Sequence, residues 1–116
     1  MMTDEQLAEH HAEDDTLLEH LAGDGDRHEI PRDVDVGFVG DPEKLEALAD
    51  ALEAQGWDAD EVYEGDDGEH VLEVVREQAI TRELIHALTA GMIEIAEKFG
   101  VTYDGWGCHL EAGTDH

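Results

Sequence analysis

The residues with the most unusual chemistry form one run near the end of the chain, Tyr103-Asp-Gly-Trp-Gly107. Gly105 and Gly107 flank Trp106, so the backbone there can bulge, bend or be approached closely. Asp104 is the one carboxylate beside this backbone, and we expect it to bond to nearby amide groups. Together these five residues are the candidate motif for binding a partner.

Trp106 has two interpretations. We expect its ring to lie in the core, with the two glycines making room for it. The alternative is an exposed aromatic anchor for a partner, because Trp and Tyr are frequent at binding hot spots. Gly105 is expected to adopt a backbone conformation that a Cβ atom would strain.

No catalytic set is predicted. The chain has no serine and no phosphate-binding glycine loop. Its single cysteine, Cys108, has no obvious base, and its acidic surroundings should raise the thiol pKa. No catalytic, metal or cofactor site is therefore expected.

The eight histidines do not predict a metal site. His10, His11 and His20 lack the i, i+4 spacing that places two ligands on one helix face. His109 should point away from its neighbour Cys108 across the strand. The paired aspartates lack the rest of a calcium-binding loop, so the histidines and acids are expected to form a solvated surface.

The charge is extreme, with 32 acidic residues against 6 basic ones and a net charge of −26. Acids occur on every predicted element, which is typical of a protein in concentrated salt, where charge repulsion is screened. A halophilic, haloarchaeal source is therefore predicted. The alternative is an acidic inhibitor that mimics a polyanion.

The same composition excludes several classes. Nucleic-acid binding needs clustered Lys and Arg, and this chain has no such cluster. One cysteine cannot form an internal disulfide. No apolar run approaches the roughly 20 residues of a membrane span, and the acidic N-terminus does not resemble a signal peptide. We expect a cytoplasmic protein with no membrane partner.

Residues 1–116 are predicted to form a single domain. A capping box at Thr3 and Gln6 begins a helix over residues 3–22. Its apolar stripe is thin and its other faces are acidic, so the helix should be peripheral, with a docking position that the sequence does not give. The core should span residues 29–111.

That core reads as β-α-β-β-α-β. Alternating apolar residues predict a strand ending near Phe38, and Asp41-Pro42 begins a helix. Trp57 should fold back on that helix. Strands follow at residues 61–64 and 71–75, then a helix ending at Gly100 and a last strand to about Leu110. The order predicts an α+β, ferredoxin-like sandwich: a four-stranded antiparallel sheet with two helices on one face and an extra N-terminal helix.

Residues 92–107 resemble the regulator of ribonuclease activity B family, through Tyr103-Asp-Gly-Trp-Gly107 directly after a helix ending in Ala-Glu-Lys-Phe. The likeness is weaker but collinear from Arg32 to Ile80. It implies a non-enzymatic, ferredoxin-like protein whose partner is ribonuclease E or another RNA-processing factor. The motif departs from the family at Cys108-His109-Leu110, and the chain ends without a long acidic tail.

The expected function is thus a protein-binding regulator of RNA processing or decay. A second hypothesis is a small-ligand module that uses the open sheet face, with a concave pocket near Trp57 and Trp106. A third is an enzyme of unknown type, which would need clustered polar groups with perturbed pKa values in a cleft.

Overall fold

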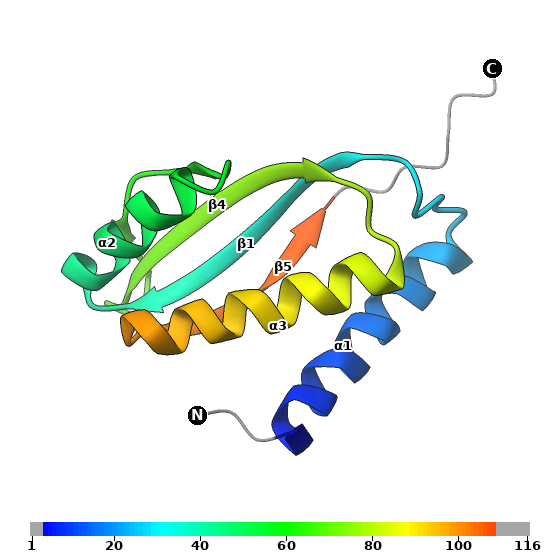
Figure 1. The fold of residues 1–116 in the computed structure, drawn as a ribbon, viewed down its shortest axis with the longest axis horizontal. Helices are drawn as coiled ribbons and strands as arrows, with labels where there is room; N and C mark the ends of the chain where they lie inside the picture. Colours follow the sequence, from blue (N-terminus) through cyan, green and yellow to red (C-terminus); the bar gives the residue numbers. More distant parts are fainter. Residues whose placement is uncertain (1–3, 109–116) are drawn as a thin grey trace.

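The computed structural model describes residues 4–108, whose arrangement is drawn in Figure 1. In chain order the elements are α1 (Asp4–Gly23), β1 (Arg32–Gly40), α2 (Pro42–Glu53), β2 (Asp58–Ala59), β3 (Tyr63–Glu64), β4 (His70–Gln78), α3 (Arg82–Phe99) and β5 (Thr102–Cys108). The predicted cap at Thr3, the position of His109 and the predicted strand end near Leu110 lie outside the described residues.

The strands form an antiparallel sheet in the order β2-β4-β1-β5, and β3 also pairs with β4. β1 lies between β4 and β5, so Pro31 marks the start of a central strand rather than an edge. The α+β class with an antiparallel sheet is confirmed. β3 lies within the strand predicted at residues 61–64, whereas β2 precedes it and was not predicted. One extra residue between β2 and β3 shifts the register along β4.

One face of the sheet carries the core. Alternate residues of β1 are buried on this face, while Asp33 and Asp35 are exposed on the other. The buried residues of α2 and α3 join the same apolar cluster, so both helices cover this face (Figure 1). The fully buried apolar side chains are Val34, Val36, Phe38, Leu45, Leu48, Leu52, Leu72, Val74, Ile80 and Ile85.

The boundaries of α2 follow from local chemistry, as predicted. The Asp41 carboxylate accepts a hydrogen bond from the Glu43 amide at 2.9 Å, and Pro42 opens the helix. After the helix, the Trp57 amide donates to the Leu52 carbonyl at 3.1 Å. Trp57 is only 3% exposed, so the ring folds back onto the helix as the sequence indicated.

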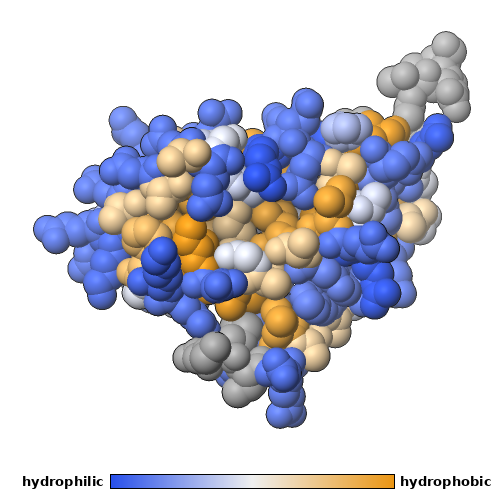
Figure 2. Space-filling model, viewed as in Figure 1, coloured by the Kyte–Doolittle hydropathy of each residue, from blue (hydrophilic) through white to orange (hydrophobic). Residues whose placement is uncertain are grey.

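The structure supplies the docking of α1 that the sequence did not give. α1 packs beside α3 on the side away from α2 (Figure 1), and its Leu18 joins the apolar cluster. Figure 2 shows hydrophilic side chains over most of one molecular face and hydrophobic ones gathered toward its middle. Each described helix and strand carries at least one acidic residue.

Candidate partner-binding site

A bulge in β5 controls where the motif residues point. Tyr103 and Trp106 are an odd number of residues apart, so a regular strand would place their rings on opposite faces. Between Tyr103 and Gly105 the register with β1 shifts, and Asp104 is the extra residue. The cross-strand pairs are Phe38 with Tyr103, Gly37 with Gly105 and Val36 with Trp106. Both rings therefore lie on the core face, toward the helices.

Gly105 makes this bulge possible. Its φ is +110°, a conformation that side-chain-bearing residues rarely adopt. A Cβ atom there would meet no other atom within 4 Å, so the restriction is the backbone angle and not crowding. The predicted requirement for glycine is confirmed.

Trp106 ties β5 to α1 through a buried carboxylate. Its indole Nε1–H donates to Asp14 Oδ1 at 2.8 Å, and Thr89 Oγ1 donates to Asp14 Oδ2 at 2.7 Å. Asp14 is 5% exposed, whereas Trp106 is half-buried and packs against the core. The ring is thus neither a fully buried core residue nor a free anchor, because it links three elements through one carboxylate.

Sequence reasoning missed Asp14, which it assigned to the solvated face of the first helix. A signal was present: Asp14 follows Leu7 by seven residues and precedes Leu18 by four, so all three lie on one helical face. A carboxylate inside an apolar stripe must find hydrogen-bond donors elsewhere in the fold. The sequence did not indicate that those donors come from α3 and β5.

Tyr103 presents a different polar group to the interior. Its hydroxyl is buried without a hydrogen-bond partner among the described residues. Burial raises the pKa of Tyr103 to about 12, and the Asp14 and Glu13 carboxylates add to the rise. The Tyr103 ring meets His10 edge to face, with centroids 5.8 Å apart.

A pocket of about 250 Å³ lies between α1 and β5. Four of the five motif residues line it together with residues of α1, and the complete lining is His10, Glu13, Asp14, Leu17, Tyr103, Asp104, Gly105 and Trp106. Gly107 lies outside this lining and pairs with Asp35 of β1. The structure thus gathers most of the motif around one concave site.

The predicted ligand pocket beside both tryptophans is wrong in its placement. Trp57 lies in a separate hollow between α2 and α3, where the Arg76 guanidinium stacks 4.3 Å from the centroid of its ring system. Trp57 belongs to the buried cluster and Trp106 packs against it, so neither ring lies on the open sheet face.

Further polar contacts attach α1 to α3. The Arg82 guanidinium donates to both Asp15 carboxylate oxygens, at 2.9 and 3.2 Å, and His86 contacts the same group at 2.8 Å. The hydrogen bond from Arg82 is the main reason that the pKa of Asp15 falls below its usual value. His11 stacks on His86 with centroids 4.1 Å apart. These histidines therefore pack between helices, in contrast to the solvated positions predicted for them.

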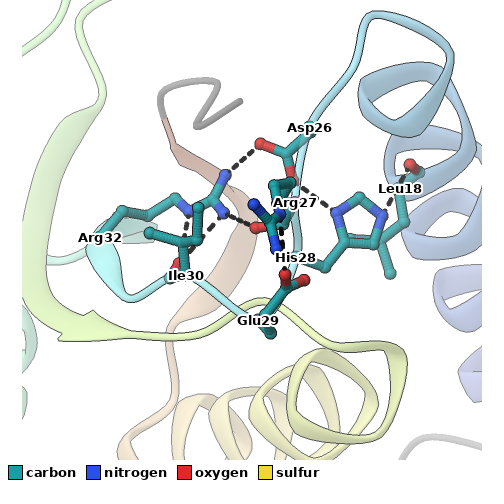
Figure 3. A network of polar contacts seen from close by, with 7 residues as sticks. All are labelled: Leu18, Asp26, Arg27, His28, Glu29, Ile30 and Arg32. Carbon is teal, nitrogen blue, oxygen red and sulfur yellow. Dashed lines mark hydrogen bonds and ion pairs between the residues drawn. The ribbon is translucent and has the colours of Figure 1, made fainter. Parts of the chain in front are cut away.

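A polar network joins the end of α1 to the start of β1 (Figure 3). Asp26 pairs with the buried guanidinium of Arg32, which also donates to the Arg27 and Ile30 carbonyls. His28 contacts the Asp26 carboxylate through Nδ1 at 2.5 Å and the Leu18 carbonyl through Nε2 at 3.1 Å. Both partners are acceptors, so both contacts are satisfied only when both ring nitrogens carry hydrogen.

Cys108 lies half-buried near this network. Burial is the main reason that the pKa of its thiol is raised, and the Asp26 and Asp35 carboxylates add to the rise while Arg32 opposes it. The predicted direction is confirmed, although burial rather than the acidic surroundings has the largest effect. Such a thiol is a poor nucleophile.

The described residues also bear on metal binding and membrane insertion. Within residues 4–108, no three His, Cys, Asp or Glu side chains are grouped to hold a metal ion. In the same range, no helix has both the length and the apolar character needed to cross a membrane.

Comparison with known proteins identifies the family. The profile of the family described as "Regulator of ribonuclease activity B" matches residues 11–108. Proteins with that name are 31% identical over 95% of this chain and 99% of the Colwellia psychrerythraea protein, and 32% identical over 96% of this chain and 84% of the Escherichia coli protein. The Pseudoalteromonas atlantica protein is 33% identical over 94% of this chain and 97% of its own length. The chain therefore belongs to the regulator of ribonuclease activity B family.

Proposed function

We propose that this protein is a non-enzymatic regulator that binds a ribonuclease and so modulates RNA processing or decay. The observation that carries the proposal is the match to relatives named as regulators of ribonuclease activity over nearly the whole chain. The sequence resemblance points to an enzyme of the ribonuclease E type as the target. No catalytic constellation was predicted from the sequence, which favours regulation through binding.

We place the contact with the ribonuclease at the β5 motif, Tyr103, Asp104, Gly105, Trp106 and Gly107. Four of these residues line a concave site beside α1, and Asp104 is exposed there. The target is the ribonuclease protein and not its RNA, because six basic residues against 32 acidic ones cannot neutralise a phosphate backbone.

The test uses the ribonuclease of the source organism. Immobilised protein should recover that enzyme from a lysate, and the purified protein should slow its cleavage of a defined RNA. Asp104→Lys should weaken both effects, while the matched control Asp58→Lys, an exposed reversal on β2 at the other edge of the sheet, should not. Failure to recover any ribonuclease, with unchanged RNA cleavage at saturating protein, would rule the proposal out.

Two finer proposals accompany the function. The strand order β2-β4-β1-β5, with both core helices on one face, supports a ferredoxin-like arrangement. The acidic residues on all elements support adaptation to a high-salt cytoplasm, although the relatives named above are bacterial and give no support for a haloarchaeal source.

The salt proposal has a direct test. At molar salt the Debye length falls to about 3 Å, which should suppress repulsion among the carboxylates. The thermal midpoint should rise by many degrees between dilute buffer and molar KCl. Equal midpoints in the two solutions would contradict it.

A further inference from the structure

The pocket between α1 and β5 is walled by aromatic rings and carboxylates. Tyr103 and Trp106 contribute rings from β5, and His10 contributes a ring from α1. Glu13 and Asp14 add carboxylates from the helix side. The lining contains no lysine or arginine. A site with aromatic faces and negative charge attracts a cation through both its rings and its carboxylates.

The charge inside the pocket is not neutralised by the protein's own described side chains. Asp14 is buried, with 5% of the residue exposed. Both of its oxygens accept from neutral donors, the Trp106 indole and the Thr89 hydroxyl. No Lys or Arg of residues 4–108 forms an ion pair with it or with Glu13. A buried carboxylate that lacks a counter-charge is stabilised when a cation enters beside it.

The volume of the pocket suits a side chain better than a larger ligand. The pocket volume of about 250 Å³ lies below the roughly 300–1,000 Å³ of typical small-molecule sites. A planar guanidinium stacks on aromatic rings and donates to a carboxylate through two parallel hydrogen bonds, whereas an ammonium is a compact and strongly hydrated charge. The two adjacent acids and the ring walls therefore suit arginine better than lysine.

We infer that this pocket binds the guanidinium group of an arginine side chain presented by the protein partner. The inference rests on the proposed function for the source of that arginine, but the pocket chemistry can be tested without the partner. Glu13, which is exposed at the rim, is the residue that a bound guanidinium would reach first.

The test uses three capped amino acids as probes: N-acetyl-arginine methylamide, its neutral isostere N-acetyl-citrulline methylamide and N-acetyl-lysine methylamide. The chain has two tryptophans, so a ¹⁵N spectrum contains two indole signals. The arginine probe should shift the Trp106 indole signal and leave that of Trp57 in place. The citrulline probe should shift neither, and the lysine probe should bind more weakly. The salt concentration is the lowest at which circular dichroism reports the native fold.

Two variants separate the pocket from the diffuse negative surface. Glu13→Gln removes one pocket charge and keeps the side-chain shape, and it should weaken binding of the arginine probe by up to about fivefold, the loss expected for an exposed ion pair. Glu19→Gln removes the same charge from an exposed site further along the same helix that does not line this pocket. It should leave the affinity within about twofold, because an exposed charge turned away from the pocket is screened by water and salt.

Each other outcome has a defined meaning. Equal binding of citrulline and arginine, equal shifts of both indoles, equal loss in the two variants or equal affinity for lysine would overturn the inference. Binding of the arginine probe without any effect on a ribonuclease would leave the pocket in place and refute the proposed function. Capture of the ribonuclease without binding of the arginine probe would support the proposed function and refute the arginine-binding pocket.

Discussion

α2 and α1 attach to the same core by different chemistry. α2 buries Leu45, Leu48 and Leu52 in the apolar cluster. α1 contributes Leu18 to the core and adds polar and ring contacts: Asp14 with Trp106 and Thr89, Asp15 with Arg82 and His86, and His11 stacked on His86. Apolar burial has no preferred direction, whereas a buried carboxylate requires donors at fixed positions. Apolar burial therefore attaches α2 to the core, whereas polar contacts fix the orientation of α1.

A tryptophan marks each attachment. Trp57 is buried against α2 under the Arg76 guanidinium. Trp106 is half-buried and reaches α1 through one hydrogen bond to Asp14. The two side chains are equal in size but differ in burial and in polar connection, so their removal tests the comparison directly.

Replacing the two tryptophans should give the largest difference. Trp57→Ala should lower the free energy of unfolding by about 3–5 kcal/mol, because a fully buried ring leaves a cavity. Trp106→Ala should lower it by about 1–3 kcal/mol, mainly through the lost donor to buried Asp14. Chemical denaturation measures both values, and hydrogen exchange should show early loss of protection in α1 only for Trp106→Ala. Equal losses of stability, with α1 still protected, would show that α2 and α1 are not attached by different chemistry.

Arg32 tests whether the loop after α1 depends on a buried ion pair. Arg32→Met leaves the buried Asp26 carboxylate without this guanidinium, so the free energy of unfolding should fall by about 3–5 kcal/mol. The neighbouring control Arg27→Met removes an exposed pair with Glu29 and should change the thermal midpoint little. A similar midpoint for the two variants would mean that α1 is held without this network.

Gly105 tests whether the polar attachment of α1 depends on the bulge in β5. Gly105→Ala should destabilise the protein by about 1–3 kcal/mol, because alanine strains the +110° φ angle. The matched control Gly91→Ala lies within α3 and has open space around it, so it should stabilise by about 0.5–1 kcal/mol. Denaturation midpoints that move in the same direction would show that the bulge carries no strain.

Tyr103 should give the smallest effect, in the opposite direction. Tyr103→Phe removes a buried hydroxyl that has no hydrogen-bond partner within residues 4–108, so the protein should become more stable by up to about 1 kcal/mol. Tyr63→Phe is the control, since its exposed hydroxyl donates to Glu73 at 3.2 Å. It should give no gain in thermal midpoint. A loss of stability in Tyr103→Phe would reveal a partner for that hydroxyl.

Elements with local signals could be predicted from the sequence. Asp41 and Pro42 start α2 because capping involves amides only two or three residues away. Gly100 ends α3 because its φ of +74° suits glycine. Alternation along β1 and the return of Trp57 onto α2 also lie within a short window, and the family motif itself is contiguous.

How the motif becomes a site depends on contacts between residues far apart in the chain. The bond from Trp106 to Asp14 joins residues 92 positions apart, and no local pattern specifies such a pairing. The bulge at Gly105 determines which face each ring occupies, because one extra residue reverses the alternation of the strand. The sequence supplied Tyr103 and Trp106 as candidates, but the buried carboxylate between them and the pocket beside α1 arise from packing across the whole chain.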